Sequence, residues 1–112
     1  MRRRTASSLL GLPVAVRGIR LGTVEAVLLD LEAARIIGLD VRCGDGANRF
    51  LPFSTARENG AGIEIGSALT LLDPPELAFY RSRSRSLAGA SELAGARIGK
   101  HGVLEGPVSG RW

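Results

Sequence analysis

The sequence predicts an all-β domain of short antiparallel strands, and two observations lead to this expectation. Residues 11–43 read as three consecutive strands joined by two turns. The composition, with 15 glycines and 5 prolines among 112 residues and 4% aromatic residues, is typical of a turn-rich β-protein. Hydrophobic residues make up 45% of the chain, which excludes wholesale disorder. We therefore expect one small domain with extensions, too small for a large enzymatic cleft.

The clearest strand signal lies at residues 35–43. Ile37, Leu39 and Val41 alternate with polar residues, among them Asp40. Strict alternation is the pattern of a strand that turns one face to the core and the other to water. We expect the three apolar side chains to be buried and Asp40 to be solvated.

The preceding strand, residues 21–29, is apolar on both faces apart from Thr23 and Glu25. A strand covered on both faces is expected at the centre of a small barrel. Residues 30–34 are long enough to form the hairpin loop that joins this strand to the next.

The rest of the domain reads as shorter elements. Further strands are expected at residues 48–53, 54–58 and 63–65, with a turn at residues 59–62 that contains Asn-Gly. The domain is expected to end at residues 69–72. Asp73, followed by two prolines, precedes about one turn of helix through residues 77–80.

Four pieces of the chain resemble the PRC-barrel family, the small β-barrel of the photosynthetic reaction-centre H subunit and of the C-terminal domain of a ribosome-maturation factor. They are residues 11–14 (GLPV), 21–30 (LGTVEAVLLD), 35–39 (RIIGL) and 50–53 (FLPF). Their order and spacing carry the resemblance. It implies a small antiparallel PRC-type β-barrel that offers loops and edge strands to a protein partner.

We expect four regions along the chain. They are a basic flexible N-terminus (1–8), a PRC-barrel-like domain (9–73), a short helical turn with an Arg/Ser linker (74–92) and a partial second PRC-like repeat (93–112).

The net charge of +4 is unevenly distributed. Residues 9–73 hold six basic and eight acidic residues and carry −2, whereas the flanks hold nine basic and three acidic residues and carry +6. A nucleic-acid-binding face on the barrel is therefore not indicated. The basic residues of the flanks include Arg2, Arg3, Arg4, Arg81, Arg83 and Arg85.

These arginines have two interpretations, solubilising arms or contacts to RNA or to an anionic membrane surface. Neither segment is expected to bury apolar surface. Deletion of residues 1–7, or replacement of the arginines at 81, 83 and 85, is therefore expected to leave the thermal midpoint nearly unchanged.

The C-terminal segment resembles the beginning of the first unit. Aligning Gly95 with Gly11 also superposes Gly102 on Gly18. The apolar residues of the segment that align with apolar residues of the first unit are Leu93, Ile98, Val103 and Val108. An isolated hairpin is marginally stable in water. It must dock on its own barrel, pair with another chain or remain loose, and from its unpaired edge we expect exchange between two chains in a homodimer.

No catalytic, cofactor-binding or metal-binding residue is predicted. One histidine and one cysteine cannot furnish an ordinary zinc site, and no glycine-framed nucleophile elbow surrounds a serine. Glu25, Asp40 and Glu64 fall at outward strand positions, where a solvated carboxylate is expected. We predict that the chain is not an enzyme.

The single cysteine, Cys43, cannot form an internal disulfide, which fits a cytoplasmic location. It is in phase with the inward face of its strand and is expected to be a buried, inert thiol. No run approaches the ~18 apolar residues that span a bilayer. The chain is therefore expected to lack the transmembrane anchor of the H subunit.

Three functions from different classes are compatible with the sequence. The first is a non-enzymatic protein-binding or adaptor module that self-associates. The alternative is an RNA- or ribosome-associated factor that uses the arginine arms, and a self-assembling structural protein is a third interpretation.

Overall fold

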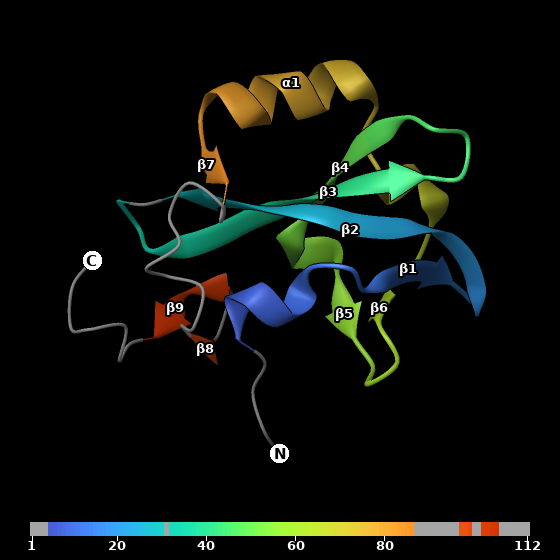
Figure 1. Cartoon of the computed structure of the whole chain (residues 1–112), viewed down its shortest axis with the longest axis horizontal. Helices are drawn as coiled ribbons and strands as arrows, with labels where there is room; N and C mark the ends of the chain where they lie inside the picture. Colours follow the sequence, from blue (N-terminus) through green and yellow to red (C-terminus); the bar gives the residue numbers. More distant parts are fainter. Residues whose placement is uncertain (1–4, 31, 87–96, 100–101, 106–112) are drawn as a thin grey trace.

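The residues expected to form three strands lie at the centre of the sheet in the computed structural model (Figure 1). The structure describes residues 5–30, 32–86, 97–99 and 102–105. The strands are β1 (Pro13–Val16), β2 (Ile19–Asp30), β3 (Arg35–Cys43), β4 (Asn48–Pro52), β5 (Arg57–Glu58), β6 (Ile63–Glu64), β7 (Arg85–Ser86), β8 (Arg97–Ile98) and β9 (Leu104–Glu105). The helices are the short 3-10 helices η1 (Ala6–Leu9), η2 (Phe53–Thr55) and η3 (Ala68–Thr70), and α1 (Pro74–Ser82). The bounds expected for the strand at residues 35–43 are confirmed.

The sheet is mixed rather than purely antiparallel. Its strands follow the order β4-β3-β2-β1-β6-β5, with β7 added to β2. β1 pairs with β6 in parallel, so the expectation of an antiparallel sheet is wrong at this point. The chain passes from β4 through η2 and β5, and β6 then returns beside β1 in the same direction. In the part of the chain that is described, no strand pairing joins β4 to β5 and closes the sheet into a barrel.

The main core lies on one face of the central strands. Leu39 and Val41 of β3 are fully buried there, as expected, together with Val14 of β1 and Val27 of β2. The short elements β6, η1 and β9 also contribute buried apolar side chains to this core. Removal of this apolar surface from water is the main stabilising term of the domain.

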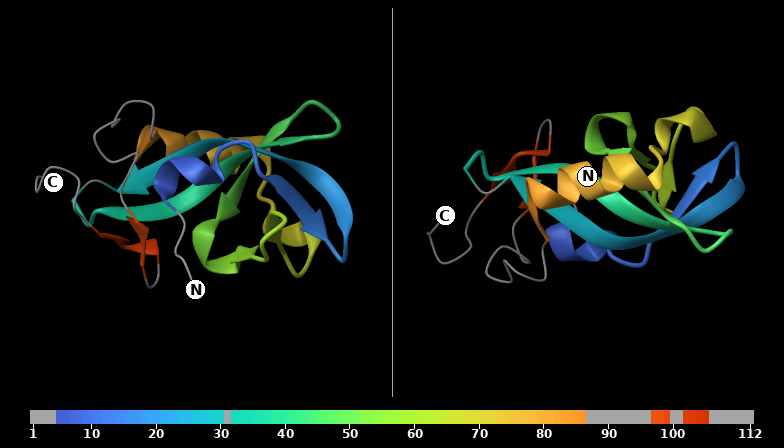
Figure 2. Two further views of the ribbon diagram at one scale, coloured as in Figure 1. Left: turned by 60° about the horizontal axis from the view of Figure 1, so that its bottom comes forward. Right: turned by 90° about the horizontal axis from the view of Figure 1, so that it is seen from above.

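Helix α1 covers the opposite face of the sheet (Figures 1 and 2). Its Leu77 is buried against Leu28 of β2 and Phe50 of β4, and the ring of Tyr80 stacks on Phe50 with centroids 4.2 Å apart. Gly38 of β3 leaves the space that the Phe50 ring occupies. The expected single turn of helix is in fact nine residues long, because this second apolar cluster gives it a surface to pack on.

Two side chains of β3 differ from the expected alternation. The pairing of β2 with β3 shifts between Leu28 and Leu29, so that Leu29 faces Ile36. Ile36 is buried in the main core, whereas Ile37 is only half-buried and contacts the cluster under α1. Strict alternation therefore fails at the irregularity.

Asp40 is 1% exposed, and the expectation that it is a solvated surface residue is wrong. It lies on the face that α1 covers. Its Oδ2 accepts a hydrogen bond from the guanidinium of Arg81 in α1, and its Oδ1 accepts one from Asn48 Nδ2 at 2.7 Å. Both carboxylate oxygens are thus paired, which offsets the cost of burying the charge.

The expectation that residues 1–7 and the Arg/Ser segment are separable from the fold is also partly wrong. In η1, Ala6 is fully buried against the core, so residues 1–7 are not separable from the fold as a unit. Beyond α1, Arg85 lies in β7, which pairs with β2. The Arg/Ser segment therefore lies along the sheet up to residue 86.

The C-terminal hairpin forms in part as expected, since β8 and β9 pair antiparallel. It lies on the sheet of its own chain. Leu104 is buried in the main core, and its amide donates to the carbonyl oxygen of Ala34 at 2.7 Å. Gly102 and Gly18, aligned by the proposed repeat, share the left-handed conformation, with φ of 78° and 80°.

Replacement of Leu39 by Ala should destabilise the domain by about 2–5 kcal/mol, because it opens a cavity in a fully buried part of the core. Urea denaturation of wild type and variant measures the difference. The matched control is Leu69→Ala at an exposed position, where a change within about 0.5 kcal/mol is expected. Equal effects of the two substitutions would contradict the burial of Leu39.

Replacement of Arg81 by Ser should cost about 3 kcal/mol, because it leaves the Asp40 carboxylate buried without a cation. Asp40→Asn should cost less, since the arginine it leaves unpaired is 55% exposed and can be solvated. Urea denaturation measures both.

The control for this experiment is Arg83→Ser, which removes the same charge from a residue that lies over the ring of Phe79. We expect this substitution to destabilise the domain by about 1 kcal/mol or less. The double variant Asp40→Asn/Arg81→Ser should recover most of the loss. An Arg81→Ser variant no less stable than Arg83→Ser would show that the ion pair does not hold α1.

Candidate functional site

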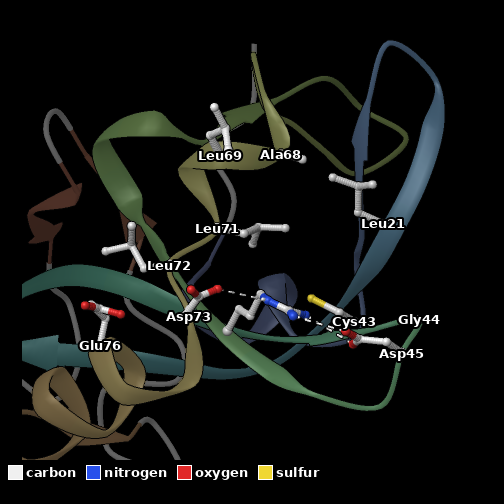
Figure 3. A pocket seen from close by; sticks show the side chains of 11 residues that line it. Leu21, Cys43, Gly44, Asp45, Ala68, Leu69, Leu71, Leu72, Asp73 and Glu76 are labelled. Atoms are coloured by element: carbon white, nitrogen blue, oxygen red, sulfur yellow. Dashed lines mark hydrogen bonds and ion pairs between the residues drawn. The ribbon is translucent and has the colours of Figure 1, made fainter.

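A groove of about 620 Å³ opens at the end of the sheet where β2 begins and β3 ends (Figure 3). We call it the end groove. It is lined by Leu21, Cys43, Gly44, Asp45, Arg49, Ala68, Leu69, Leu71, Leu72, Asp73 and Glu76. The volume lies within the ~300–1,000 Å³ that is usual for binding pockets.

The floor of the end groove is formed by the turn between β3 and β4. Gly46 adopts a φ of 88°, which favours glycine, and its amide donates to the carbonyl oxygen of Cys43 at 2.9 Å. Asp45 accepts a hydrogen bond from the amide of Ala47 at 3.0 Å. The turn thereby holds the Asp45 carboxylate beside β4.

Arg49 lies between the carboxylates of Asp45 and Asp73. Its two terminal nitrogens donate to the two oxygens of Asp45 at 3.1 and 3.0 Å, and its Nε lies 3.7 Å from Oδ1 of Asp73. The bond to Arg49, and then that to the Ala47 amide, lower the pKa of Asp45 below its ordinary value of 3.8. The bond to Asp45, followed by that to Cys43, raises the pKa of Arg49.

The apolar wall of the end groove comes from η3. Ser67 caps this helix by accepting a hydrogen bond from the amide of Leu69 at 3.1 Å. The two leucines of this wall differ in burial, because Leu71 packs into the core whereas Leu69 is 87% exposed. Leu72 returns to the sheet, where it exchanges backbone hydrogen bonds with Phe50 of β4. Figure 3 shows Leu21 of β2 across the groove from Leu72.

The acidic wall comes from the start of α1. Asp73 is the N-cap residue, and its carbonyl oxygen accepts from the amides of Glu76 and Leu77 at 2.9 and 3.2 Å. Pro74 and Pro75 fit the first helical positions, where an N–H is not needed. Two carboxylates therefore stand at one edge of the groove, at the helix end that favours negative charge.

The end groove presents an apolar wall beside charged groups, and its described residues form no catalytic arrangement. Each oxygen of Asp45 is already hydrogen-bonded to Arg49. Within the described ranges no group of three or more histidine, cysteine, aspartate or glutamate side chains could hold a metal ion. Cys43 is half-buried on the groove floor, more exposed than expected of an inward residue.

Of the arginines expected to make contacts, Arg81 and Arg83 lie at the end of α1 and Arg85 lies in β7 of the sheet. Arg81 pairs with Asp40, Arg83 lies 4.0 Å above the ring of Phe79, and Arg85 is exposed in β7. The backbone of these three residues is therefore part of α1, its C-cap and β7, and is not a free arm. The other candidates, Arg2, Arg3 and Arg4, lie outside the described residues.

Of the four residues expected to mediate self-association, two lie in the described part of the chain. Ile98 packs against the main core and Val103 is exposed at a bridge to Arg35. Leu93 and Val108 lie outside the described residues. Exchange of the hairpin between two copies stays a prediction.

The other two carboxylates expected on the surface, those of Glu25 and Glu64, accept hydrogen bonds from other parts of the fold. Glu25 accepts a hydrogen bond from Asn48 Nδ2 at 2.7 Å, and Glu64 accepts one from the backbone amide of Arg17 at 2.6 Å.

No helix among the described residues is long and apolar enough to span a bilayer.

The end groove is not predicted by the sequence. Its residues come from separate segments, and only two local signals point to it. One is the spacing of Asp45 and Arg49, and the other is Leu69 in the short segment between Gly66 and Asp73.

The Asp45–Arg49 pair should make stability depend on pH. A lowered folded-state pKa contributes stability that is fully present above 3.8 and is lost as the pH falls through the folded value. The thermal midpoint of Asp45→Asn should therefore lie below that of wild type at neutral pH, and the gap should close as the pH falls below 3.8. Asp30→Asn is the control, because Asp30 accepts turn amides without a hydrogen bond from an arginine among the described residues.

Comparison with known proteins agrees with this architecture. A family model of the PRC-barrel domain matches residues 1–67, which include η1 and β1 to β6. A search of curated proteins found no significant match. PRC-barrel domains are generally non-catalytic and are expected to form a β-barrel fold. Since the matched residues make up more than half of the chain, the protein belongs to the PRC-barrel domain family.

Proposed function

We propose that this chain is a non-enzymatic protein-binding module and that its partner docks in the end groove. The observation that carries the proposal is Leu69, which is 87% exposed beside a hollow of about 620 Å³. Single exposed apolar residues are common on convex surfaces and need no explanation. An exposed leucine that borders a concave, partly apolar surface is typical of a binding site.

The polar part of the end groove also supports binding rather than chemistry. Arg49 and Asp45 satisfy each other through two parallel hydrogen bonds, an arrangement with defined geometry. A rigid floor with paired charges can orient a bound segment without reacting with it. Preorganisation of this kind reduces the entropy lost on association.

RNA binding by the arginines is supported less well. The guanidinium of Arg81 is engaged by the buried Asp40, so a phosphate would have to compete with that carboxylate. Arg83 lies over Phe79, away from the main core. A basic face would need several such groups free at once.

The test is capture of partners from the native cell by immobilised full-length protein at low and high salt. Leu69→Ser should reduce recovery of the specific partner at least tenfold, and a contact held by apolar surface should survive high salt. The control is Ile19→Ser, which alters an apolar residue that is 66% exposed outside the groove. Equal recovery with Leu69→Ser and wild type would place the site elsewhere.

A further inference from the structure

We infer that the end groove takes a partner segment in which a cationic side chain lies close to an apolar one. The inference rests on the proposed protein-binding function and adds the chemistry of the partner. It follows from how the charges and apolar side chains are divided between the two walls.

Arg49, the one guanidinium that lines the end groove among the described residues, is not available to an anion. Arg49 gives both terminal nitrogens to Asp45, and its Nε faces Asp73. An acidic partner would have to break this bidentate pair to reach the arginine. It would also meet an excess of carboxylates, because three carboxylates and one guanidinium of the described residues line the groove.

The surplus negative charge stands at the start of α1. The side chain of Asp73 is 76% exposed, and its 3.7 Å separation from Arg49 is longer than a hydrogen bond. No described residue forms an ion pair with the exposed Glu76. The N-terminal end of a helix favours carboxylates, so the two charges are held at this edge. A lysine or arginine of the partner would complement them.

The apolar part of the groove lies beside this acidic edge. Figure 3 shows Leu69 and Ala68 on one side, and Asp73 and Glu76 on another, with Leu71 and Leu72 between them. A bound segment can therefore place one apolar side chain against Leu69 while a neighbouring cation faces the carboxylates. Like charge at the acidic edge would oppose an otherwise identical acidic segment.

The acidic edge belongs to the part of the chain beyond the family match. The match ends at residue 67, whereas Leu69, Asp73 and Glu76 follow it. Arg49 and Asp45, which form the floor, lie inside the matched residues. The charge preference is thus a property that the continuation of this chain adds to the floor supplied by the domain.

The experiment measures binding of three fluorescein-labelled synthetic peptides to the full-length protein by fluorescence anisotropy. The peptides share one leucine-containing sequence and differ at two flanking positions, which hold lysine, glutamine or glutamate. The lysine peptide should bind about five- to tenfold more tightly than the glutamate peptide at low salt, and the preference should shrink as salt is added. The double variant Asp73→Asn/Glu76→Gln should lose the preference, whereas the control Glu32→Gln, exposed outside the groove, should keep it.

The outcomes separate this inference from the proposed function. If all three peptides bind equally well and Leu69→Ser weakens them all, the inference is wrong and the docking groove stands. If none binds, both fail. A lysine preference that persists in the double variant also overturns the inference, because the cationic side chains would then be bound by another surface. Self-association that the lysine peptide disrupts, and that the double variant abolishes, supports it and identifies a basic segment of a second copy as the occupant.

Discussion

The contact between Asp40 and Arg81 is the constraint on which the second layer of this domain depends. Asp40 carries a charge on the covered face of β3, and its burial is tolerable only while Arg81 and Asn48 pair with its two oxygens. Arg81 reaches it from the last turn of α1. The ion pair therefore requires α1 to lie across β3 and β4. Leu77 and Tyr80 then fill the cluster with Phe50.

The same helix connects this constraint to the candidate site. The C-terminal part of α1 is tied to β3 by Arg81, and its N-terminal part presents Asp73 and Glu76 to the end groove. The segment just before α1 is tied to β4 by the backbone bridge between Leu72 and Phe50. A helix fixed at both ends cannot easily rotate its first turn. The acidic edge of the groove is therefore positioned by contacts that lie outside it.

Much of the sheet was predictable because its signals are local. The bounds of β3 follow from its alternation, and the turn before β6 follows from Asn59 and Gly60. The errors arise where a partner distant in sequence decides the environment. The alternation places Asp40 on the face away from the main core, but it does not show that α1 covers that face. The parallel pairing of β1 with β6 is likewise a property of the chain path, which no local pattern encodes.

The end groove illustrates the same limit for function. Two of its residues have an ordinary local role, since the Asp45 carboxylate accepts a turn amide and Asp73 is the N-cap residue of α1. They become a site only when β3, β4, η3 and α1 converge on one end of the sheet. The net charge of residues 9–73 gives an indirect indication of the partner class, because a mildly acidic domain is not expected to bind nucleic acid through its own surface. The charge count does not give location. In the structure the surplus carboxylates lie beside the exposed Leu69, and the proposed preference for a cationic partner segment rests on that location.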